Sequence, residues 1–285
     1  MNNPLVSVLM TIYNRESFLA EAIESVLSSS YQNWELILVD DKSLDNSEKI
    51  ARDYQEKDSR IRLYINEQNL GDYPNRNKAA TYARGKYIKY LDSDDLIYPD
   101  SLAILVDFME QHPSAAIGLE VDALNLLSQA CRVMPGVEVL RKSFLEKAFM
   151  LCGPTGTIFR RDVFESMSGF GQDTFVGSDT IFYLRVALSH DILLFRKNYM
   201  FYREHEQQEF LLRKKDYFIN SFKEYRKIIL DPKTPLSVEE QEQALLKLRN
   251  LHIGQTIRFI KKLNFRFAYY TFFKSGFFRQ MLLIS

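Results

Sequence analysis

The stretch LVSVLMTIYNRESFLAEAIESVLSSSYQNWELILVDD, residues 5–41, contains the pattern that decides the fold. Its two ends, residues 5–13 and 34–40, are short apolar runs rich in β-forming residues, which is typical of buried strands. The apolar residues between them recur at helical spacing. A strand, a helix and a second strand in this order predict a βαβ unit with two parallel strands.

The same alternation continues along the chain. Residues 61–66 and 86–92 have the character of strands, and residues 17–30, 43–57 and 73–85 have helical spacing. The series predicts an α/β fold with a mainly parallel sheet flanked by helices. A parallel open sheet binds ligands beyond the carboxyl ends of its strands, so functional residues are expected directly after the strands.

Polar groups do follow each of the four predicted strands. They are Tyr13-Asn14, Asp40-Asp41, the segment from Asn69 to Arg76, and Asp92-Ser93-Asp94. The last group belongs to KYIKYLDSDDLIYPD, residues 86–100, where three carboxylates occupy four positions after an apolar run. Because like charges repel, this cluster predicts a cation or a partner that offsets the repulsion.

Composition limits the class of protein. The chain has 285 residues, 46% of them hydrophobic, which suits one large domain or a domain with an appendage. Cys131 and Cys152 are too few for a disulfide framework, and no signal peptide or membrane span is apparent, so a cytoplasmic protein is expected. The net charge is zero, but no acid follows Glu242, and basic residues continue to Arg279. No nucleic-acid partner is expected.

The segments VSVLMTIYNRESFLAEAIESVLSSSYQNWELILVDDKSLDNS and NLGDYPNRNKAATYARGKYIKYLDSDD resemble the nucleotide-sugar-binding half of the family 2 glycosyltransferases. The resemblance covers roughly residues 5–205. It implies the GT-A fold, with a Rossmann-like nucleotide-binding half. It implies a domain at 1–209, of which about 1–98 bind the nucleotide sugar and 99–209 the acceptor, and a helical C-terminal extension at 210–285.

The resemblance implies a divalent metal, Mn or Mg, bound by an Asp-x-Asp element. Asp94 would be the direct ligand, and Asp92 would lie nearer the ribose or a metal-bound water. Hard cations prefer carboxylate oxygens together with substrate phosphates. Since alternate side chains of an extended segment point the same way, Asp92 and Asp94 are expected to converge while Asp95 turns aside. The alternative is a turn in which Asp95 caps the next helix.

The resemblance also assigns the donor pocket. Asp41 would accept the ring N–H of the nucleotide base, and Thr11 and Tyr13 would line the base pocket. Arg76 would lie near the diphosphate, although GDYPNRNKA departs from the family pattern at Asn75 and Ala79. The alternatives are that the Asp40-Asp41 pair caps the following helix and that Tyr13 is a packing residue.

The second half contains further candidates. In GPTGTIFRRDVFESMSGFGQDTFVGSDTIFYLRVAL, Asp179 is the remaining member of the family's acidic pair and would be the general base, because Ser178 replaces the other acid. His205, in YMFYREHEQQE, would complete the metal site or hold the diphosphate, and Arg203 would support the acidic cluster. The alternatives are a helix N-terminal carboxylate at Asp179 and a polar surface group at His205.

The last part of the chain is predicted to be helical. Residues 237–263 have helical spacing of leucine and isoleucine, behind a capping box formed by Ser237 and Glu240. Residues 258–285 interleave aromatic and basic side chains and contain no acid. This composition suits peripheral contact with the inner face of an anionic membrane, or else docking into the core or a dimer interface.

Together these features predict a metal-dependent, inverting glycosyltransferase. It would move a sugar from a nucleoside-diphosphate donor, a UDP-sugar being favoured, to a hydroxyl of a glycan or lipid-linked acceptor, in surface polysaccharide synthesis. The alternatives are a catalytically silent nucleotide- or carbohydrate-binding protein and a sugar nucleotidyltransferase. Sugar nucleotidyltransferases tend to carry a glycine-rich phosphate loop near the first strand. In this chain the first strand runs into TIYNRES, which contains no glycine.

Overall fold

The computed structural model describes residues 3–121, 130–146, 152–171, 175–196, 199–204, 220–262 and 265–269. The chain forms two compact units. Unit 1 comprises Met1–Met134, Met150–Thr174 and Asp191–Glu204, and unit 2 comprises Pro135–Phe149, Phe175–His190 and His205–Ser285. The predicted division at residue 209 does not coincide with these units, because two internal segments group with the C-terminal part. As a functional division it stays a prediction.

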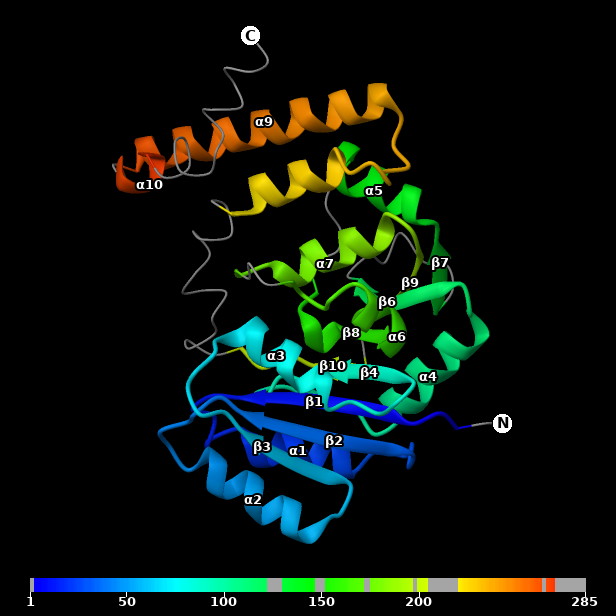
Figure 1. Ribbon diagram of the computed structural model, residues 1–285, viewed down its shortest axis with the longest axis vertical. Helices are drawn as coiled ribbons and strands as arrows, with labels where there is room; N and C mark the ends of the chain where they lie inside the picture. Colours follow the sequence, from blue (N-terminus) through cyan, green and yellow to red (C-terminus); the bar gives the residue numbers. More distant parts are fainter. Residues whose placement is uncertain are drawn as a thin grey trace. The chain divides into compact units, whose positions relative to one another are not determined.

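Within the described residues, unit 1 is built on an eight-stranded sheet in the order β3-β2-β1-β4-β8-β6-β9-β7 (Figure 1). The strands are β1 (Val6–Ile12), β2 (Trp34–Asp40), β3 (Ile61–Ile65), β4 (Tyr87–Tyr90), β6 (Ala115–Val121), β7 (Cys131–Met134), β8 (Thr157–Arg160) and β9 (Asp191–Arg196). The helices are α1 (Leu19–Leu27), α2 (Ser47–Lys57), α3 (Asp72–Thr81), α4 (Ser101–Gln111) and α6 (Arg161–Ser166), with the short 3₁₀ helix η1 (Pro154–Gly156).

The first half of the sheet has the predicted parallel topology. β1 pairs in parallel with both β2 and β4, and β2 pairs in parallel with β3. In Figure 1, α1 and α2 lie on one side of these strands and α3 lies on the other. The chain thus reverses its winding direction between β3 and β4, and the carboxyl ends of β1 and β4 meet where the reversal occurs.

The second half of the sheet is mixed. β8 pairs antiparallel to both β4 and β6, and β7 pairs antiparallel to β9, whereas β6 and β9 are parallel. A separate two-stranded antiparallel sheet joins β5 (Leu96–Ile97) to β10 (Met200–Phe201). Through these pairings, η1 and the segment 199–204 reach the end of β4, although both lie far from it in the sequence.

The core of unit 1 forms because its strands are apolar on both faces. All residues of β1 except Thr11 and all of β2 are buried, as a strand covered by helices requires. α1 packs on this surface through Leu19, Ala22, Ile23 and Val26, whose spacing places them on one helical face. Burial of this apolar surface stabilises the sheet at roughly 25 cal/mol per Å².

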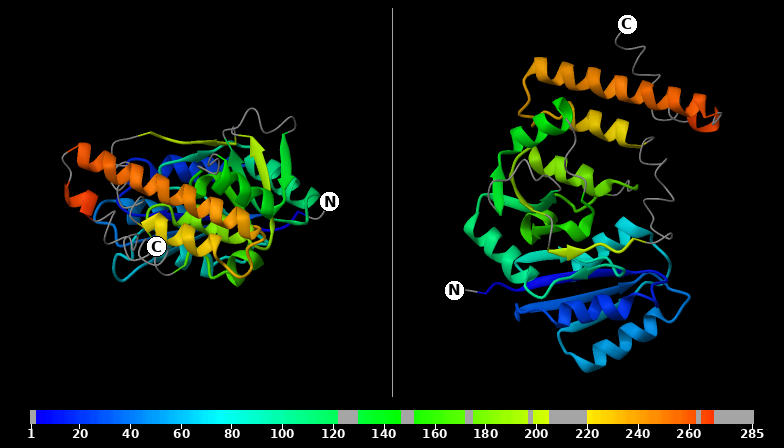
Figure 2. Two further views of the ribbon diagram at one scale, coloured as in Figure 1. Left: turned by 90° about the horizontal axis from the view of Figure 1, so that it is seen from above. Right: turned by 180° about the vertical axis from the view of Figure 1, so that it is seen from behind.

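Unit 2 is helical in its described part. It contains α5 (Gly136–Leu145), α7 (Ser178–Ala187), helical residues 220–229, α9 (Val238–Lys261) and α10 (Phe265–Tyr269), and Figure 2 shows α9 beside residues 220–229. The predicted capping box is confirmed, because the Ser237 side chain accepts from Glu240 N–H while the Glu240 carboxylate accepts from Ser237 N–H. The Arg141–Glu240 ion pair, at 2.6 Å, links α5 to α9.

Candidate active site

The acidic residues after β4 lie in a tight turn, which we call the acid turn and define as Leu91–Asp95. The backbone N–H of Asp95 donates to the carbonyl of Asp92 at 2.9 Å, so the chain folds back here. Carboxylate oxygens of Asp92, Asp94 and Asp95 lie within 4.8 Å of one another. The structure therefore brings Asp92 and Asp94 together, as the sequence analysis expected.

The expectation that Asp95 turns aside or caps a helix is wrong. Asp95 belongs to the cluster, and the N-cap of α4 is Asp100. The reason is the turn, because residues i and i+3 of a turn lie close together whereas those of an extended strand do not. Asp95 is buried, and this burial raises the pKa of its carboxyl to about 7, with Asp92 and Asp94 acting in the same direction.

Guanidinium groups from three segments surround the acid turn. The Nε of Arg15 donates to Oδ2 of Asp94 at 3.1 Å, and Nε of Arg203 donates to the carbonyl of Asp94 at 3.0 Å. Arg76 donates from a terminal nitrogen to Oδ1 of Asp92 at 2.7 Å. These groups offset the repulsion that the clustered carboxylates would otherwise cause. The predicted support from Arg203 is present in this geometry.

Arg76 is the most deeply buried of these cations. Its Nε also donates to Asp72 at 2.6 Å, and 8% of its side chain is exposed. Burial alone would lower the pKa of Arg76, but Asp72 and Asp92 outweigh it and hold that pKa well above its ordinary value. The guanidinium is therefore a fixed positive charge beside Asp92. Its predicted contact with a diphosphate stays a prediction.

The Asp41 carboxylate accepts hydrogen bonds from other residues of the protein in this structure. Its Oδ1 accepts from the side chain of Asn66 at 2.7 Å and from Leu70 N–H at 2.8 Å, and its Oδ2 accepts from Gly71 N–H at 2.9 Å. The carboxylate is buried, so here it holds the loop that leads into α3. The alternative that the Asp40-Asp41 pair caps the following helix is wrong, because the N-cap of α2 is Asn46 and the Oδ1 of Asp40 accepts from Ser43 N–H in the preceding loop. Recognition of a base by Asp41 stays a prediction.

Thr11 and Tyr13 lie at the carboxyl end of β1. The carbonyl of Thr11 accepts from the Ser93 hydroxyl at 2.9 Å, which joins β1 to the acid turn. The Tyr13 side chain is 43% exposed, so it is not a core packing residue. Next to it, Asn14 has a left-handed φ of 53° and accepts from Leu44 N–H at 2.8 Å, tying this loop to the one after β2.

The remaining candidates lie in unit 2 or outside the described residues. Asp179 is in the first turn of α7, is buried, and accepts from Thr180 N–H at 2.7 Å. Gly177 precedes the helix with a left-handed φ of 99°. This position and this hydrogen bond are compatible with a catalytic general base, and equally with a carboxylate that only stabilises the start of the helix. The role of Asp179 as general base therefore stays a prediction. His205 lies outside the described residues.

Sequence reasoning missed three residues that contact the acid turn or its supports. Arg15 follows the end of β1, so the rule that strand ends converge would have identified it had the search extended one residue past Asn14. Thr155 accepts from Asp92 N–H at 2.9 Å, and Lys89 is a fully buried lysine of β4. Neighbouring residues in the sequence do not indicate the roles of Thr155 and Lys89, because these roles depend on the antiparallel placement of β8 beside β4.

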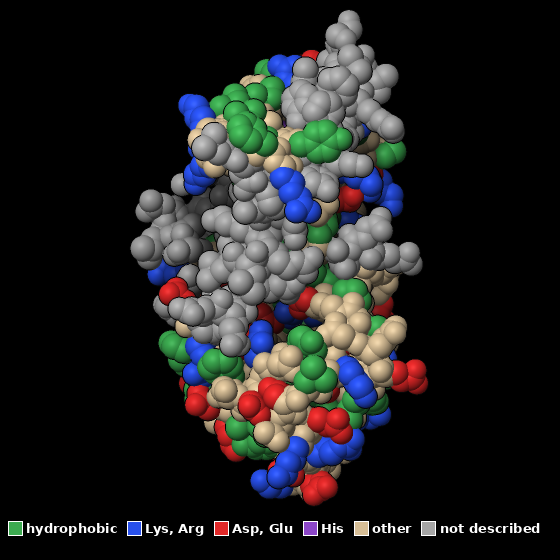
Figure 3. Space-filling view, turned by 90° about the vertical axis from the view of Figure 1, so that its left-hand side faces the viewer, with side chains coloured by type: hydrophobic (Ala, Val, Ile, Leu, Met, Phe, Trp, Pro, Cys, Tyr) green, Lys and Arg blue, Asp and Glu red, His purple; other side chains and the backbone are tan. Residues whose placement is uncertain are grey.

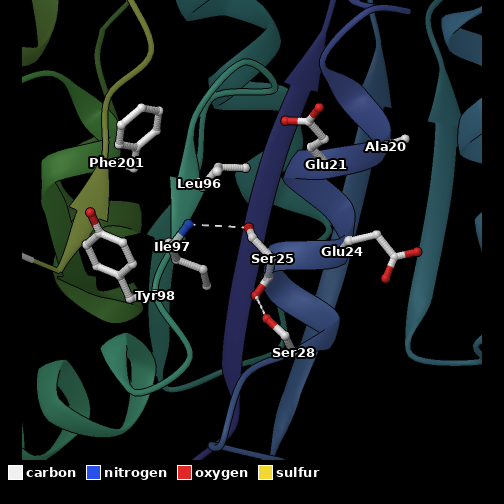
Figure 4. A pocket seen from close by; sticks show the side chains of 9 residues that line it. All are labelled: Ala20, Glu21, Glu24, Ser25, Ser28, Leu96, Ile97, Tyr98 and Phe201. Atoms are coloured by element: carbon white, nitrogen blue, oxygen red, sulfur yellow. Dashed lines mark hydrogen bonds between the residues drawn. The ribbon is translucent and has the colours of Figure 1, made fainter.

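A shallow groove of about 730 Å³ lies between α1 and the β5/β10 sheet (Figure 4). In Figure 4, Tyr98 and Phe201 lie on the side of the β5/β10 sheet, and Glu21 and Glu24 lie on α1. None of the acid-turn carboxylates lines this groove. The groove nevertheless adjoins the acid turn, because Leu96 follows Asp95 and Glu21 pairs with Arg203 at 2.6 Å.

The donor set of the acid turn fits a hard divalent cation. It consists of carboxylate oxygens alone, without sulfur or imidazole among the described residues. Asp92 and Asp94 are partly exposed, so a cation held there could also reach substrate phosphates.

Comparison with known sequences identifies the class of protein. Residues 7–167 match Glycosyl transferase family 2, and the chain belongs to this family. It is 45% identical over 112 residues to an uncharacterised glycosyltransferase of Haemophilus influenzae, covering 39% of this chain and 45% of the relative. It is 41% identical over 108 residues to the minor teichoic acid biosynthesis protein GgaB of Bacillus subtilis, covering 37% of this chain and 12% of GgaB. The chain thus spans less than half the length of these relatives.

Solved structures confirm the expected GT-A fold. Residues 1–349 of TarS of Staphylococcus aureus in complex with UDP-GlcNAc superimpose with a TM-score of 0.69 at 20% identity, covering 87% of this chain and 72% of that chain. The mannosyltransferase PcManGT of Pyrobaculum calidifontis, in complex with GDP-Man and Mn²⁺, gives a TM-score of 0.64 at 16% identity, covering 96% and 76%.

Proposed function

We propose that this chain is a metal-dependent, inverting glycosyltransferase. It would transfer a sugar from a nucleoside-diphosphate sugar to a hydroxyl of a glycan or lipid-linked acceptor. The observation that carries the proposal is the acid turn, where Asp92, Asp94 and Asp95 converge at the carboxyl end of β4 beside the end of β1. In an open α/β sheet this is the position at which a nucleotide and its metal are bound.

Asp92 and Asp94 would hold the metal, Mn or Mg, and His205 would complete its site. When bound, the metal would neutralise charge that develops on the departing diphosphate. Arg15 and Arg76, which form ion pairs with Asp94 and Asp92, would hold these carboxylates in a fixed orientation. These side chains would thus form a preorganised set of charges at the place where the diphosphate departs.

Thr11, Tyr13 and Asp41 would form the pocket for the nucleotide base. Tyr13 is exposed at the end of β1, where its ring is free to stack on a base. Asp41 would have to exchange one of its loop hydrogen bonds for the base N–H. We favour a UDP-sugar as donor, which the likeness to TarS in complex with UDP-GlcNAc supports.

Asp179 would be the general base. The acceptor oxygen forms a bond to the anomeric carbon while the bond from that carbon to the diphosphate oxygen breaks, and the hydroxyl proton passes to the Asp179 carboxylate. Attack from the face opposite the leaving group inverts the anomeric configuration. The position of Asp179 in the first turn of α7, where the resemblance places the family's acidic pair, supports this role.

We place the reaction in surface polysaccharide synthesis on the cytoplasmic face of the membrane. The likeness to GgaB, a teichoic acid biosynthesis protein, supports the pathway class. Among the described helices, none has the length and apolar character that a bilayer span requires. Contact with the membrane would therefore be peripheral as far as these residues are concerned.

The end of α9 and α10 support that contact. Ile257, Ile260 and Phe265 are exposed, with Arg258 and Lys261 among them. The space-filling view shows hydrophobic side chains next to basic ones in this region (Figure 3). Aromatic and aliphatic groups flanked by cations suit an anionic lipid surface, and a homodimer interface is the competing use of the same face. The rest of the proposed contact, residues 270–285, lies outside the described residues.

The test is a product assay with the purified chain, Mn²⁺ and a panel of nucleoside-diphosphate sugars, with and without acceptor glycans. Release of free nucleoside diphosphate that depends on acceptor and stops in chelator supports the proposal. Release of pyrophosphate from a nucleoside triphosphate and a sugar phosphate would instead indicate a nucleotidyltransferase. Binding of the nucleotide sugar with no product in any combination would indicate a silent binding protein.

A further inference from the structure

Two buried polar residues support the acid turn. They are Lys89, in β4, and Thr155, in η1, and both are fully buried. We call this pair the brace. Its members are 66 positions apart in the sequence, and they meet because β8, which follows η1, pairs with β4.

The Thr155 side chain contacts the acid turn at Asp92 and at Asp95. Its oxygen accepts from the backbone N–H of Asp92 at 2.9 Å, and its side chain also hydrogen-bonds the carboxyl of Asp95. A hydroxyl has one donor and two acceptor positions, so it can serve both contacts at once. Thr155 therefore supports the turn from the side of η1, in addition to the backbone hydrogen bond between Asp95 and Asp92.

Lys89 fixes the position of Thr155. Its ammonium donates to the carbonyl of Tyr90 at 2.7 Å and to the carbonyl of Thr155. Burial lowers the pKa of Lys89 to about 8, and Glu120, Asp92 and Asp95 oppose this shift. An apolar side chain at this core position would avoid the cost of burying an ammonium, so the lysine adds something that packing alone would not. It joins η1 to β4 and places a positive charge behind the acid turn.

We propose that Thr155 and Lys89 are positioning residues, which hold the acid turn in the conformation that presents its carboxylates to a metal. The inference rests on the proposed function, since it assumes that the acid turn binds a divalent cation. Neither residue would touch the metal or the substrate. Residues that orient metal ligands typically change metal affinity by about ten-fold to one hundred-fold when they are replaced.

The test measures Mn²⁺ affinity directly, by calorimetry on the full chain without any sugar donor. Thr155→Val keeps the shape of the side chain but removes the hydroxyl, and should weaken Mn²⁺ binding roughly ten-fold or more. Thr155→Ser keeps the hydroxyl and should restore affinity to within about three-fold of wild type. Lys89→Met should weaken binding in the same direction.

Thr157→Val is the matched control. Thr157 is equally buried and its hydroxyl donates to the carbonyl of Pro154 at 2.6 Å within the same short segment, but no hydrogen bond joins it to the acid turn. This variant should lose stability to a similar extent and keep wild-type Mn²⁺ affinity. A merely structural role for Thr155 would give both valine variants the same affinity.

The outcomes separate the inference from the function. Equal Mn²⁺ affinity in wild type and Thr155→Val would overturn the inference alone. Failure of wild type to bind Mn²⁺ would overturn the metal-dependent function and the inference with it. Circular dichroism reports whether each variant folds. If Thr155→Val does not fold, Lys89→Met decides the question, because wild-type affinity in that variant would contradict the brace.

Discussion

At the scale of single residues, the acid turn shows how a fold accommodates a dense cluster of like charge. Asp92 and Asp94 each have an arginine partner, and Asp95 accepts from the backbone N–H of Arg203 at 3.1 Å. These contacts balance the negative charge of the cluster. Asp92 and Asp94 nevertheless remain partly exposed. The energy of the cluster therefore depends on individual side chains, and single substitutions can test it.

Asp94→Ala should abolish metal-dependent release of nucleoside diphosphate and lower Mn²⁺ affinity by at least about ten-fold, while the fold survives. The physical reason is that the substitution removes a hard oxygen ligand from a partly exposed turn and leaves the core intact. Calorimetry and the product assay measure the two effects. Asp100→Ala is the control, since Asp100 is an exposed acid after β5 and lies outside the cluster. Comparable losses in both variants would show that the acid turn is not the metal site.

Asp95 predicts a pH dependence of stability in the metal-free protein. Its pKa is raised from 3.8 to about 7 in the folded state, so between these values the folded state binds more protons than the unfolded state. The free energy of unfolding therefore falls as the pH rises through this window, and the loss is complete above it. Asp95→Asn removes the contribution.

The measurement is chemical denaturation of both proteins in chelator at pH 4 and pH 8. The advantage of Asp95→Asn over wild type should be larger at pH 8 by more than about 1.4 kcal/mol, which corresponds to one pKa unit. Identical pH profiles for the two proteins would show that the Asp95 carboxyl is not destabilised by its burial.

At the scale of secondary-structure elements, the ends of strands and helices position the candidate groups. The carboxyl ends of β1 and β4 present Tyr13 and the acid turn, and the first turn of α7 presents Asp179. An acid in the first turn of a helix is also favoured by the helix dipole, so position alone does not separate catalysis from stability. A matched pair of helices in this chain can separate them.

Asp179→Asn should reduce sugar transfer by about two to four orders of magnitude with donor binding nearly unchanged, because the amide keeps the shape but does not accept the proton. Asp162→Asn is the control. Asp162 lies in the first turn of α6 and accepts from the next backbone N–H at 2.9 Å, as Asp179 does at 2.7 Å. Steady-state kinetics and thermal unfolding compare the pair. Wild-type transfer in Asp179→Asn, with stability losses alike in both variants, would assign Asp179 to helix stabilisation.

At the scale of the whole molecule, charge is sorted along the chain. No acid follows Glu242, and the described end of unit 2 exposes apolar side chains on α9 and α10 among basic ones. A surface of this kind gains roughly 1 kcal/mol for each basic group near an anionic membrane, and the gain falls as salt is added. The location of the protein in the cell would then follow from its last thirty or so residues.

A truncation after Leu263 should reduce binding to phosphatidylserine-containing vesicles, and the intact protein should detach from them between low and physiological salt. Co-sedimentation measures both, with neutral vesicles as the control. Sedimentation of the intact protein alone reports its oligomeric state. An intact protein that ignores anionic vesicles at low salt, or a truncated one that unfolds, would assign this face to a subunit interface or to the core.

The sequence by itself determined the first half of unit 1 and most of its candidate residues. The alternation of apolar runs with helical spacing is local, and it correctly predicted β1 to β4 with the helices between them. The Asp-x-Asp element and the capping box of α9 are also local, since each depends on residues within four positions. Interactions that extend over a single turn or strand can be predicted from the sequence, because they involve only neighbouring residues.

Only the tertiary structure decided what surrounds the acid turn. Whether Asp95 joins the cluster depends on a turn that an extended-strand pattern does not reveal. The contacts of Arg15 and Thr155 with the turn join residues 79 and 63 positions apart, and Thr155 reaches it only because β8 runs antiparallel to β4. The pairing of distant strands depends on the burial of both faces of the whole sheet, and no local pattern carries that information.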